Sequence, residues 1–451
     1  MKNFKHKHFA FCICLTLIVS LLFTSSALAL DFKEPSNTIS GDVDGDQKVT
    51  SEDALLTLQH SVGKTTLAID RAAAAKVSGS GDVSTADALL ILQYSTGKIA
   101  VFPCDEVKEA RIKELLNLKQ ELRFGQDGKF TVLQLSDPQE KGIVPPLTQN
   151  IIRSFVEAAE PDLVIFTGDN IYDDYVYQQT YGKPMDREGF IGYFRDLSKP
   201  MEEKGIPWCM VFGNHDSEFL PFSRKEQMEI CMESFEHFVG MVGDENISGI
   251  GNYVLPVLRS DSDKIGFNVW ALDTGDYLDN WQEGLGDQVV LENNLYNGSS
   301  YDYIHLDQQL WYWNTSVALE EYNGAKIPGA MYVHIPLNEF AIIAQNPGAT
   351  GMTGIKDEGI GASSINSGMF TTILKRGDVK GFYAGHAHNN NFAGKYCGIE
   401  LGFCGAISYY DYGGWEGHQP HRSTCSGRVL EVDENDAWNF TTSLLLYQDL
   451  I

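Results

Sequence analysis

Short apolar runs alternate with amphipathic stretches from about residue 124 to residue 451, and this order is typical of an α/β domain with buried strands. The predicted strands span residues 130–135, 163–167, 207–212, 253–258, 267–273, 329–333 and 381–384. The predicted helices span residues 147–159, 190–204, 225–238 and 305–321. Further short strands near Ile407, Val429 and Thr441 indicate antiparallel pairing late in the chain.

A second pattern, an internal repeat, occupies residues 36–100. The segment from Asp53 to Lys64 matches the segment from Asp87 to Lys98 at most positions, with an offset of 34 residues. Each copy consists of a loop followed by an amphipathic helix that ends at a glycine. We expect the leucines of the two helices to form the core of this region, namely Leu55, Leu58, Leu89 and Leu92.

The first loop of the repeat carries acidic residues at the spacing of a calcium site. Asp42, Asp44 and Asp46 occupy loop positions 1, 3 and 5, and Asp53 occupies position 12. With the Lys48 carbonyl at position 7, these groups supply the hard oxygen ligands that a flexible Ca²⁺ site requires. The first loop is therefore predicted to bind Ca²⁺.

The second loop departs from this pattern. It keeps Asp87 at position 12, but Lys76, Ser78 and Ser80 stand where Asp or Asn would be expected. Lys76 places a positive charge where a carboxylate ligand should be. Calcium binding is therefore predicted for the first loop and left open for the second.

The paired loops and helices resemble the dockerin domain, the calcium-dependent module that binds cohesin modules in cellulosomes. The resemblance implies a small all-α calcium-binding domain, a cohesin module of a scaffoldin as partner, and an extracellular location. Residues Ser51-Glu52 and Thr85-Ala86 correspond to positions that set cohesin choice in dockerins. Gln47 is a departure, because glycine is usual at that loop position.

The first 29 residues have the pattern of a secretory signal peptide. Three lysines precede an apolar run from Phe9 to Phe23, and Ala27-Leu28-Ala29 supplies small residues for cleavage. No later stretch is apolar for long enough to span a bilayer, so we expect an exported, soluble protein. Residues 101–123 read as a charged connector helix before the domain at 124–451.

The chain is acidic, with a formal net charge of -27 at pH 7. Such a field repels polyphosphate backbones, so a nuclease or another nucleic-acid-binding function is disfavoured. The six cysteines after the signal peptide permit disulfides in an exported protein. Cys209 lies within a predicted strand and is expected to be a core residue.

Polar clusters close five of the predicted strands of the α/β region. In chain order these clusters are Asp137, Gly168-Asp169, Gly213-Asn214-His215-Asp216, His334 and Gly385-His386-Ala387-His388. Neutral imidazole is the commonest transition-metal ligand, and carboxylates can bridge two ions. The strand ends therefore predict a metal site.

The residues divide into the ligands of a dinuclear centre. Asp169 is the expected bridge, because Gly168 lets the backbone turn sharply at the end of a strand. Asp137 and His388 are expected to bind one metal ion together with Asp169. Asn214, His334 and His386 are expected to bind the other.

His215 is left without a metal in this assignment. It can protonate a leaving alkoxide, and its neighbour Asp216 can orient it or raise its basicity. Both residues are therefore candidate catalytic residues.

In their order, these clusters resemble the motifs of the calcineurin-type metallophosphoesterase superfamily, which includes the purple acid phosphatases. Residues Leu272–Tyr277 and His334–Leu337 resemble the small extracellular, purple-acid-phosphatase-related branch. The resemblance covers about Phe124 to the C-terminus and implies two mixed β-sheets packed face to face, with helices outside. It also implies two metal ions, drawn from Mn, Fe, Zn or Mg, and hydrolysis of phosphate esters by a metal-bound hydroxide.

Two departures from the family pattern bear on the site. Gln139 stands where the first motif usually has histidine; its amide oxygen is a weaker, harder donor that favours Mn, Mg or Fe over Zn. Tyr172 takes the place of a second-motif aspartate and is expected to pack at the pocket rim. His421 and Arg422 are tentative substrate contacts in a late loop, with Arg428 beyond them.

Three functions remain in competition. A phosphomonoesterase is preferred to a phosphodiesterase, although both use the same ligands. In the third reading, Gln139 marks loss of the first metal and the domain is a catalytically idle binding module. The retained His215 argues against idleness, because an inactive domain has no need of an unligated imidazole beside the metals.

Overall fold

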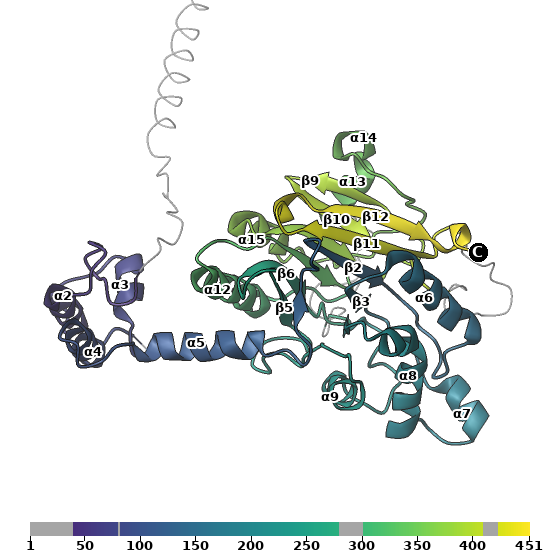
Figure 1. Cartoon of the computed structure of the whole chain (residues 1–451), viewed down its shortest axis with the longest axis horizontal. Helices are drawn as coiled ribbons and strands as arrows, with labels where there is room; N and C mark the ends of the chain where they lie inside the picture. The colour runs from purple at the N-terminus through teal and green to yellow at the C-terminus, as the bar shows by residue number, and fades with distance from the viewer. Residues whose placement is uncertain (1–38, 80–81, 279–300, 409–422) are drawn as a thin grey trace, which may run out of the picture. The chain divides into compact units, whose positions relative to one another are not determined.

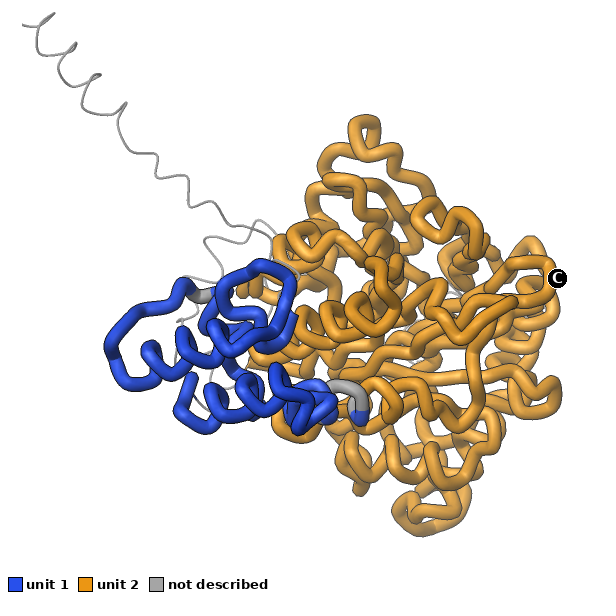
Figure 2. The backbone as a smooth tube through the Cα atoms, turned by 60° about the vertical axis from the view of Figure 1, so that its left-hand side comes forward, with its two compact units in different colours: residues 1–110 blue, residues 111–451 orange. Residues whose placement is uncertain are grey.

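The computed structural model describes residues 39–79, 82–278, 301–408 and 423–451. The predicted signal peptide and the tentative contacts His421 and Arg422 lie outside the described residues. Within these ranges, no helix combines the length and apolar character needed to cross a membrane. The chain forms two compact units, residues 1–110 and 111–451, coloured separately in Figure 2. Their boundary lies inside helix α5 (Pro103–Leu116), within the predicted connector, whereas the other predicted domain limits remain predictions.

The first unit contains the two helices predicted from the repeat. Helices α2 (Ser51–Ser61) and α4 (Thr85–Ser95) begin alike: Thr50 or Ser84 forms a capping box with the aspartate at N3, Asp53 or Asp87. A short helix, α3 (Ile69–Ala75), lies between them in sequence. The repeat therefore encodes the same helix start twice.

The predicted core of the first unit was wrong. Leu55, Leu58, Leu89 and Leu92 are exposed, at 53%, 41%, 56% and 41% of their surface. The core instead contains residues from the loops and from the neighbouring stripe of each helix: Val43, Ala54, Ala75, Val77, Ile91 and Phe102. The small side chain of Ala54 leaves room for α4, and the leucines one position further on lie on the outer stripe of each helix.

The second unit contains two mixed β-sheets, as the family resemblance implies (Figure 1). In the described chain, the seven-stranded sheet has the order β1 (Leu122–Arg123), β5 (Tyr253–Leu258), β6 (Ile265–Ala271), β7 (Gly329–Val333), β8 (Val379–Ala384), β10 (Ile399–Phe403) and β9 (Ala393–Tyr396). The five-stranded sheet has the order β12 (Thr441–Leu446), β11 (Ser426–Asp433), β2 (Lys129–Leu135), β3 (Leu163–Thr167) and β4 (Trp208–Val211).

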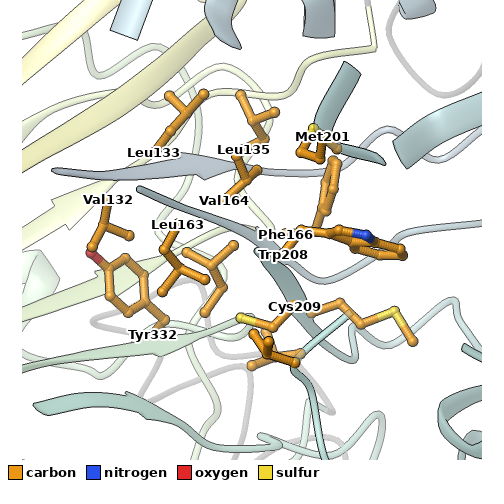
Figure 3. Packing of buried hydrophobic residues seen from close by; sticks show 14 of the residues in the cluster. Val132, Leu133, Leu135, Leu163, Val164, Phe166, Met201, Trp208, Cys209 and Tyr332 are labelled. Carbon is orange, nitrogen blue, oxygen red and sulfur yellow. The ribbon is translucent and has the colours of Figure 1, made fainter. Parts of the chain in front are cut away.

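Side chains alternate between two cores along the strands. In β7, Tyr332 belongs to the core between the sheets and Met331 to the core on the other face. Figure 3 shows Tyr332 beside Val132 of β2 and Leu163 of β3. Because strand side chains alternate in direction, the central strands are buried on both faces, whereas the edge strand β12 is partly exposed.

Helices cover the outer faces of both sheets (Figure 1). The five-stranded sheet packs with α6 (Pro146–Ala159), α8 (Arg187–Lys204) and α9 (Arg224–Ser234). The seven-stranded sheet packs with α12 (Leu306–Asn323), α13 (Phe340–Gln345) and α15 (Met369–Arg376). The fold is the sandwich of two mixed sheets flanked by helices that the family resemblance implies.

Several local elements differ from the predictions. Helix α9 ends at Ser234, four residues early, because Phe235 has extended backbone. No strand forms at Ile407. The β9–β10 hairpin was missed because its two-residue turn, Cys397-Gly398, has φ of 49° and 80°, and cysteine is an unusual residue for that conformation. In the described chain, five short helices were also missed: α3, α7 (Tyr175–Tyr181), α13, α14 (Pro347–Thr350) and α15.

Candidate metal centre

The site forms where strands of both sheets end. Strands β2, β3 and β4 run parallel in one sheet, and β7 and β8 run parallel in the other. The polar clusters follow the carboxyl ends of these five strands. Two hydrogen bonds tie the sheets together there: His334 Nδ1 to the Thr167 carbonyl at 2.8 Å, and His386 N–H to Asp137 Oδ2 at 3.1 Å.

The backbone at the strand ends is strained. Asp137, Gln139, Asp169 and His386 have φ of 53°, 48°, 47° and 72°. These are four of the seven non-glycine residues with positive φ in the described chain. Left-handed backbone is costly for such residues and collects at functional sites, where the surrounding structure enforces it.

Glycines let the site residues pack against one another. A Cβ on Gly213 would lie 2.2 Å from Asp169 Oδ1, and one on Gly168 would lie 2.4 Å from His334 Nδ1. A Cβ on Gly385 would lie 2.0 Å from Ser136 Oγ. The glycines of three motifs are therefore needed for close approach as well as for turning the chain.

Two groups of metal-ligating atoms meet at Asp169. One group contains Asp169, His334 and His386, and the other contains Asp137, Asp169 and His388. Within each group the ligand atoms lie within 4.8 Å of one another. The division of histidines between the groups is the one expected from the sequence, and Asp169 is common to both, as a bridging carboxylate must be.

The two amide residues of the predicted ligand set are also buried in the site. Asn214 Oδ1 lies 3.2 Å from His334 Nε2. Gln139 Nε2 lies 3.5 Å from Asp169 Oδ2, while Gln139 Oε1 has no hydrogen-bond partner in the described chain; nor does Asp137 Oδ1. Buried acceptors without donors are costly unless a cation is present. The oxygen and imidazole donors therefore fit two metal ions.

Burial and the charges of neighbouring residues shift the pKa values of the site residues in opposite directions. Burial raises the pKa of Asp137, although His388 opposes it. For Asp169, burial also acts upward, but the charge of His334 outweighs it and lowers the pKa below its usual value. His334 has a pKa raised to about 9 because Asp169 outweighs the effect of burial, whereas burial and His334 lower that of His386.

The predicted pairing of His215 with Asp216 was wrong. The buried Asp216 carboxylate instead accepts backbone N–H groups of Gly213, Asn170 and Ile171, so it anchors the loop. Burial and the charge of Asp169 raise its pKa to about 7. The His215 ring contacts Glu218 through Nδ1.

Glu218 was missed by the sequence reading. It stands three residues after His215, outside the motif. Predicting a turn at 215–218 would have indicated it, because a turn brings the first and fourth residues together.

Tyrosine rings surround the site. The Tyr172 ring packs edge-on against His215 with centroids 4.9 Å apart, the rim position expected for it. Tyr301 packs edge-on against His386 at 4.3 Å and stacks on Tyr277 at 5.7 Å. Tyr277 and Tyr301, which flank the undescribed residues 279–300, were not predicted.

The guanidinium of Arg428 is occupied by backbone carbonyls and is not placed to bind phosphate. Its buried guanidinium donates to the backbone carbonyls of Phe403 and Asn391, which ties β11 to the seven-stranded sheet. Arg428 therefore has a structural role in the described chain.

The first repeat loop has the form of a calcium-binding loop. Asp42, Asp44 and Asp53 bring carboxylate oxygens within 4.8 Å of one another. Asp46 accepts the N–H of Lys48 at 2.9 Å in the same loop, and the Lys48 carbonyl is its remaining predicted ligand. Gln47 has φ of 69°, so this departure from glycine keeps the left-handed turn. These acceptors fit Ca²⁺.

Two family models match the chain. The family model of the calcineurin-like phosphoesterases matches residues 130–390 of the 451. The chain belongs to the calcineurin-like phosphoesterase family. Within this calcineurin-like phosphoesterase, residues 40–94 also match the dockerin type I domain.

Relatives of this calcineurin-like phosphoesterase include two proteins of Arabidopsis thaliana. The probable inactive purple acid phosphatase 29 is 32% identical over 70% of this chain and 80% of its own length. The probable inactive purple acid phosphatase 14 is 31% identical over 66% and 75%. A solved cohesin–dockerin complex of Acetivibrio cellulolyticus matches 15% of this chain and 93% of the compared chain, at 38% identity and a TM-score of 0.14.

Proposed function

We propose that this protein is a secreted, dinuclear-metal-dependent phosphoesterase that attaches to a cellulosome through its dockerin. The observation that carries the catalytic part is the position of Asp169, which belongs to both groups of ligand atoms. A carboxylate shared by two ions, with imidazoles on both sides, suits in-line displacement at a phosphate. Phosphomonoesters are the preferred substrate class.

The metals would be held by seven side chains: Asp137, Gln139, Asp169, Asn214, His334, His386 and His388. When bound, two such ions neutralise phosphate charge and lower the pKa of a water. His215, which is outside both ligand groups and contacts Glu218 through Nδ1, protonates the oxygen of the leaving group through Nε2. Tyr172 and Tyr301 pack against the two sides of this centre and exclude water from it.

The catalytically idle binding module is the competing function, and the names of the two Arabidopsis relatives include the word inactive. Gln139 is the residue on which that alternative rests. Its side chain is 1% exposed, lies beside Asp169, and has a buried oxygen without a hydrogen-bond partner in the described chain. An amide oxygen in this position can replace an imidazole for a hard metal, which favours Mn, Mg or Fe.

The experiment is hydrolysis of p-nitrophenyl phosphate and bis-p-nitrophenyl phosphate by metal-stripped protein after addition of Mn, Mg, Zn or Fe. Metal-dependent turnover that Asp169→Asn loses by about 100-fold or more supports the phosphoesterase. The preferred ester separates monoesterase from diesterase. Folded protein without turnover in any metal supports the idle module instead, and Gln139→His then tests whether this residue is the cause.

The surface that the dockerin offers to a cohesin follows from the corrected core. Leu55, Leu58, Leu89 and Leu92 form an exposed apolar surface on α2 and α4, and Ser51-Glu52 and Thr85-Ala86 are exposed at the starts of the same helices. Exposed leucines grouped in this way are typical of a protein-binding surface. We propose that these leucines contact the cohesin and that the helix starts select among cohesins.

Calorimetric titration of the full chain with a purified type I cohesin in Ca²⁺ tests this contact. Leu58→Ala with Leu92→Ala should weaken binding by about tenfold or more without changing the helical content. Leu374→Ala, at a leucine of α15 that is 44% exposed, is the matched control. Unchanged affinity in the double variant would exclude the leucine surface, and Ca²⁺-independent binding would exclude a dockerin mode.

A further inference from the structure

Glu218 lies in one turn with His215. The N–H of Glu218 donates to the His215 carbonyl at 3.2 Å, and the turn brings Glu218 Oε2 to 2.6 Å from His215 Nδ1. The side chains of the two residues are 22% and 20% exposed. Both side chains are therefore partly accessible to solvent, whereas Asp169 beside them is buried.

The turn does not depend on the Glu218 side chain. Asp216 fixes it by accepting the N–H groups of Gly213 at 2.7 Å and Asn170 at 2.8 Å. The His215 N–H donates to Asp169 Oδ1 at 2.9 Å. The backbone is thus held by two other carboxylates, and the Glu218 carboxylate is left to contact the imidazole ring and the Tyr277 hydroxyl.

Two contacts restrict the ring of His215. Nδ1 faces Glu218, and the ring plane meets Tyr172 edge-on at an interplanar angle of 64°. A carboxylate acceptor at Nδ1 favours the tautomer with its proton on Nδ1, so Nε2 is the nitrogen left for chemistry. Tyr277 joins this arrangement to the metal ligands, because its hydroxyl accepts from Asn214 Nδ2 at 3.1 Å.

We propose that Glu218 is the positioning residue of His215, holding the ring and its tautomer so that Nε2 meets the leaving group. This inference rests on the proposed phosphoesterase function. In the step it serves, water forms a new bond to phosphorus and the bond from phosphorus to the leaving oxygen breaks. The imidazolium, which carries a proton on each nitrogen, gives its Nε2 proton to that oxygen and becomes the neutral Nδ1-protonated form that Glu218 favours; the proton lost by water restores the imidazolium.

Leaving-group dependence in the metal-loaded full chain tests the role. In Glu218→Gln, kcat for glycerol 2-phosphate should fall about 10- to 100-fold, because an alkoxide departs only when protonated. For p-nitrophenyl phosphate, whose leaving group departs unprotonated, the fall should be under about threefold. Glu229→Gln, at a glutamate of α9 whose side chain is 47% exposed, should change neither rate. Equal losses for both esters, or none, would overturn the proposal.

A second measurement separates this proposal from the proposed function. Imidazole ¹⁵N chemical shifts of His215, assigned by comparison with His215→Ala, report the tautomer of the ring. Wild-type protein should show the Nδ1-protonated form, and Glu218→Gln should show a mixture. If no ester is hydrolysed but this change occurs, the phosphoesterase function fails and the positioning role stands. An unchanged tautomer ratio rejects Glu218 whatever the turnover.

Discussion

His334 Nε2 lies 3.3 Å from His386 Nδ1 and 3.3 Å from Asp169 Oδ2, although the three residues follow three different strands. The contact between the two histidines indicates a metal site, because two imidazole nitrogens face each other in a buried position. A single cation between them would satisfy both lone pairs together with the carboxylate. Three predicted ligands therefore converge on one point.

Removing the shared carboxylate should affect both metal ions, whereas removing one imidazole should affect one. We expect Asp169→Asn to lose both metals and His386→Ala to lose one, each with a fall of about 100-fold or more in activity. Metal analysis by mass spectrometry after gel filtration gives the stoichiometry. His237→Ala, whose ring contacts Gln120, is the control and should retain the wild-type content. Equal metal loss in the Asp169 and His386 variants would contradict a bridge.

Gly213→Ala should damage the site by steric contact alone. The new Cβ would meet Asp169 Oδ1 at 2.2 Å and the Asp169 N at 2.3 Å. We expect a loss of about 1–3 kcal/mol in the free energy of unfolding together with weaker metal binding. Gly192→Ala, in α8 with no atom within 4 Å of the added Cβ, should be neutral or stabilising by up to about 1 kcal/mol. Denaturant unfolding measures both, and equal stabilities would refute the packing argument.

Calcium stoichiometry should distinguish the two repeat loops. Asp53 and Asp87 play the same capping role, so alanine at either position should cost about 1 kcal/mol of helix stability. Only Asp53 lies with two other aspartates, Asp42 and Asp44, in the described chain. We therefore expect one Ca²⁺ per chain, lost in Asp53→Ala and kept in Asp87→Ala. Two bound ions, or loss in both variants, would show that the second loop also binds.

Thiol labelling should follow burial. Cys397 is exposed, whereas Cys209, Cys231, Cys404 and Cys425 are buried free thiols, so Cys397 and Cys404 do not form a disulfide. Burial raises the pKa of Cys209 and Cys404 to about 12, which removes the reactive thiolate at neutral pH. We expect Cys397→Ser to remove the fastest phase of reaction with Ellman's reagent, and Cys209→Ser to leave it unchanged. Rapid labelling of Cys209 in folded protein would contradict the buried position.

Much of the fold was predictable because its strands are short apolar runs with clear ends. Strands β3, β5 and β7 have the predicted limits, and the paired sheets of the family resemblance are present. The missed hairpin at Cys397-Gly398 shows the limit of this reading. Its left-handed turn depends on a cysteine that gives no turn signal.

The leucines of the first unit show why periodicity alone could not identify a core. Ala54 and Leu55 are adjacent apolar residues on one helix, yet the first is buried and the second is 53% exposed. A pattern of apolar positions gives the candidate stripes, but the neighbouring helix determines which stripe is covered.

The sequence by itself determined the ligand types and their order, because a metal site must use carboxylate, amide and imidazole side chains placed where strands end. Only the tertiary structure decided which carboxylate serves which role. Asp216 and Glu218 both stand within three residues of His215. The turn buries the first against backbone N–H groups and brings the second to the ring, because side-chain direction in a turn depends on local backbone angles and on the strand beside it.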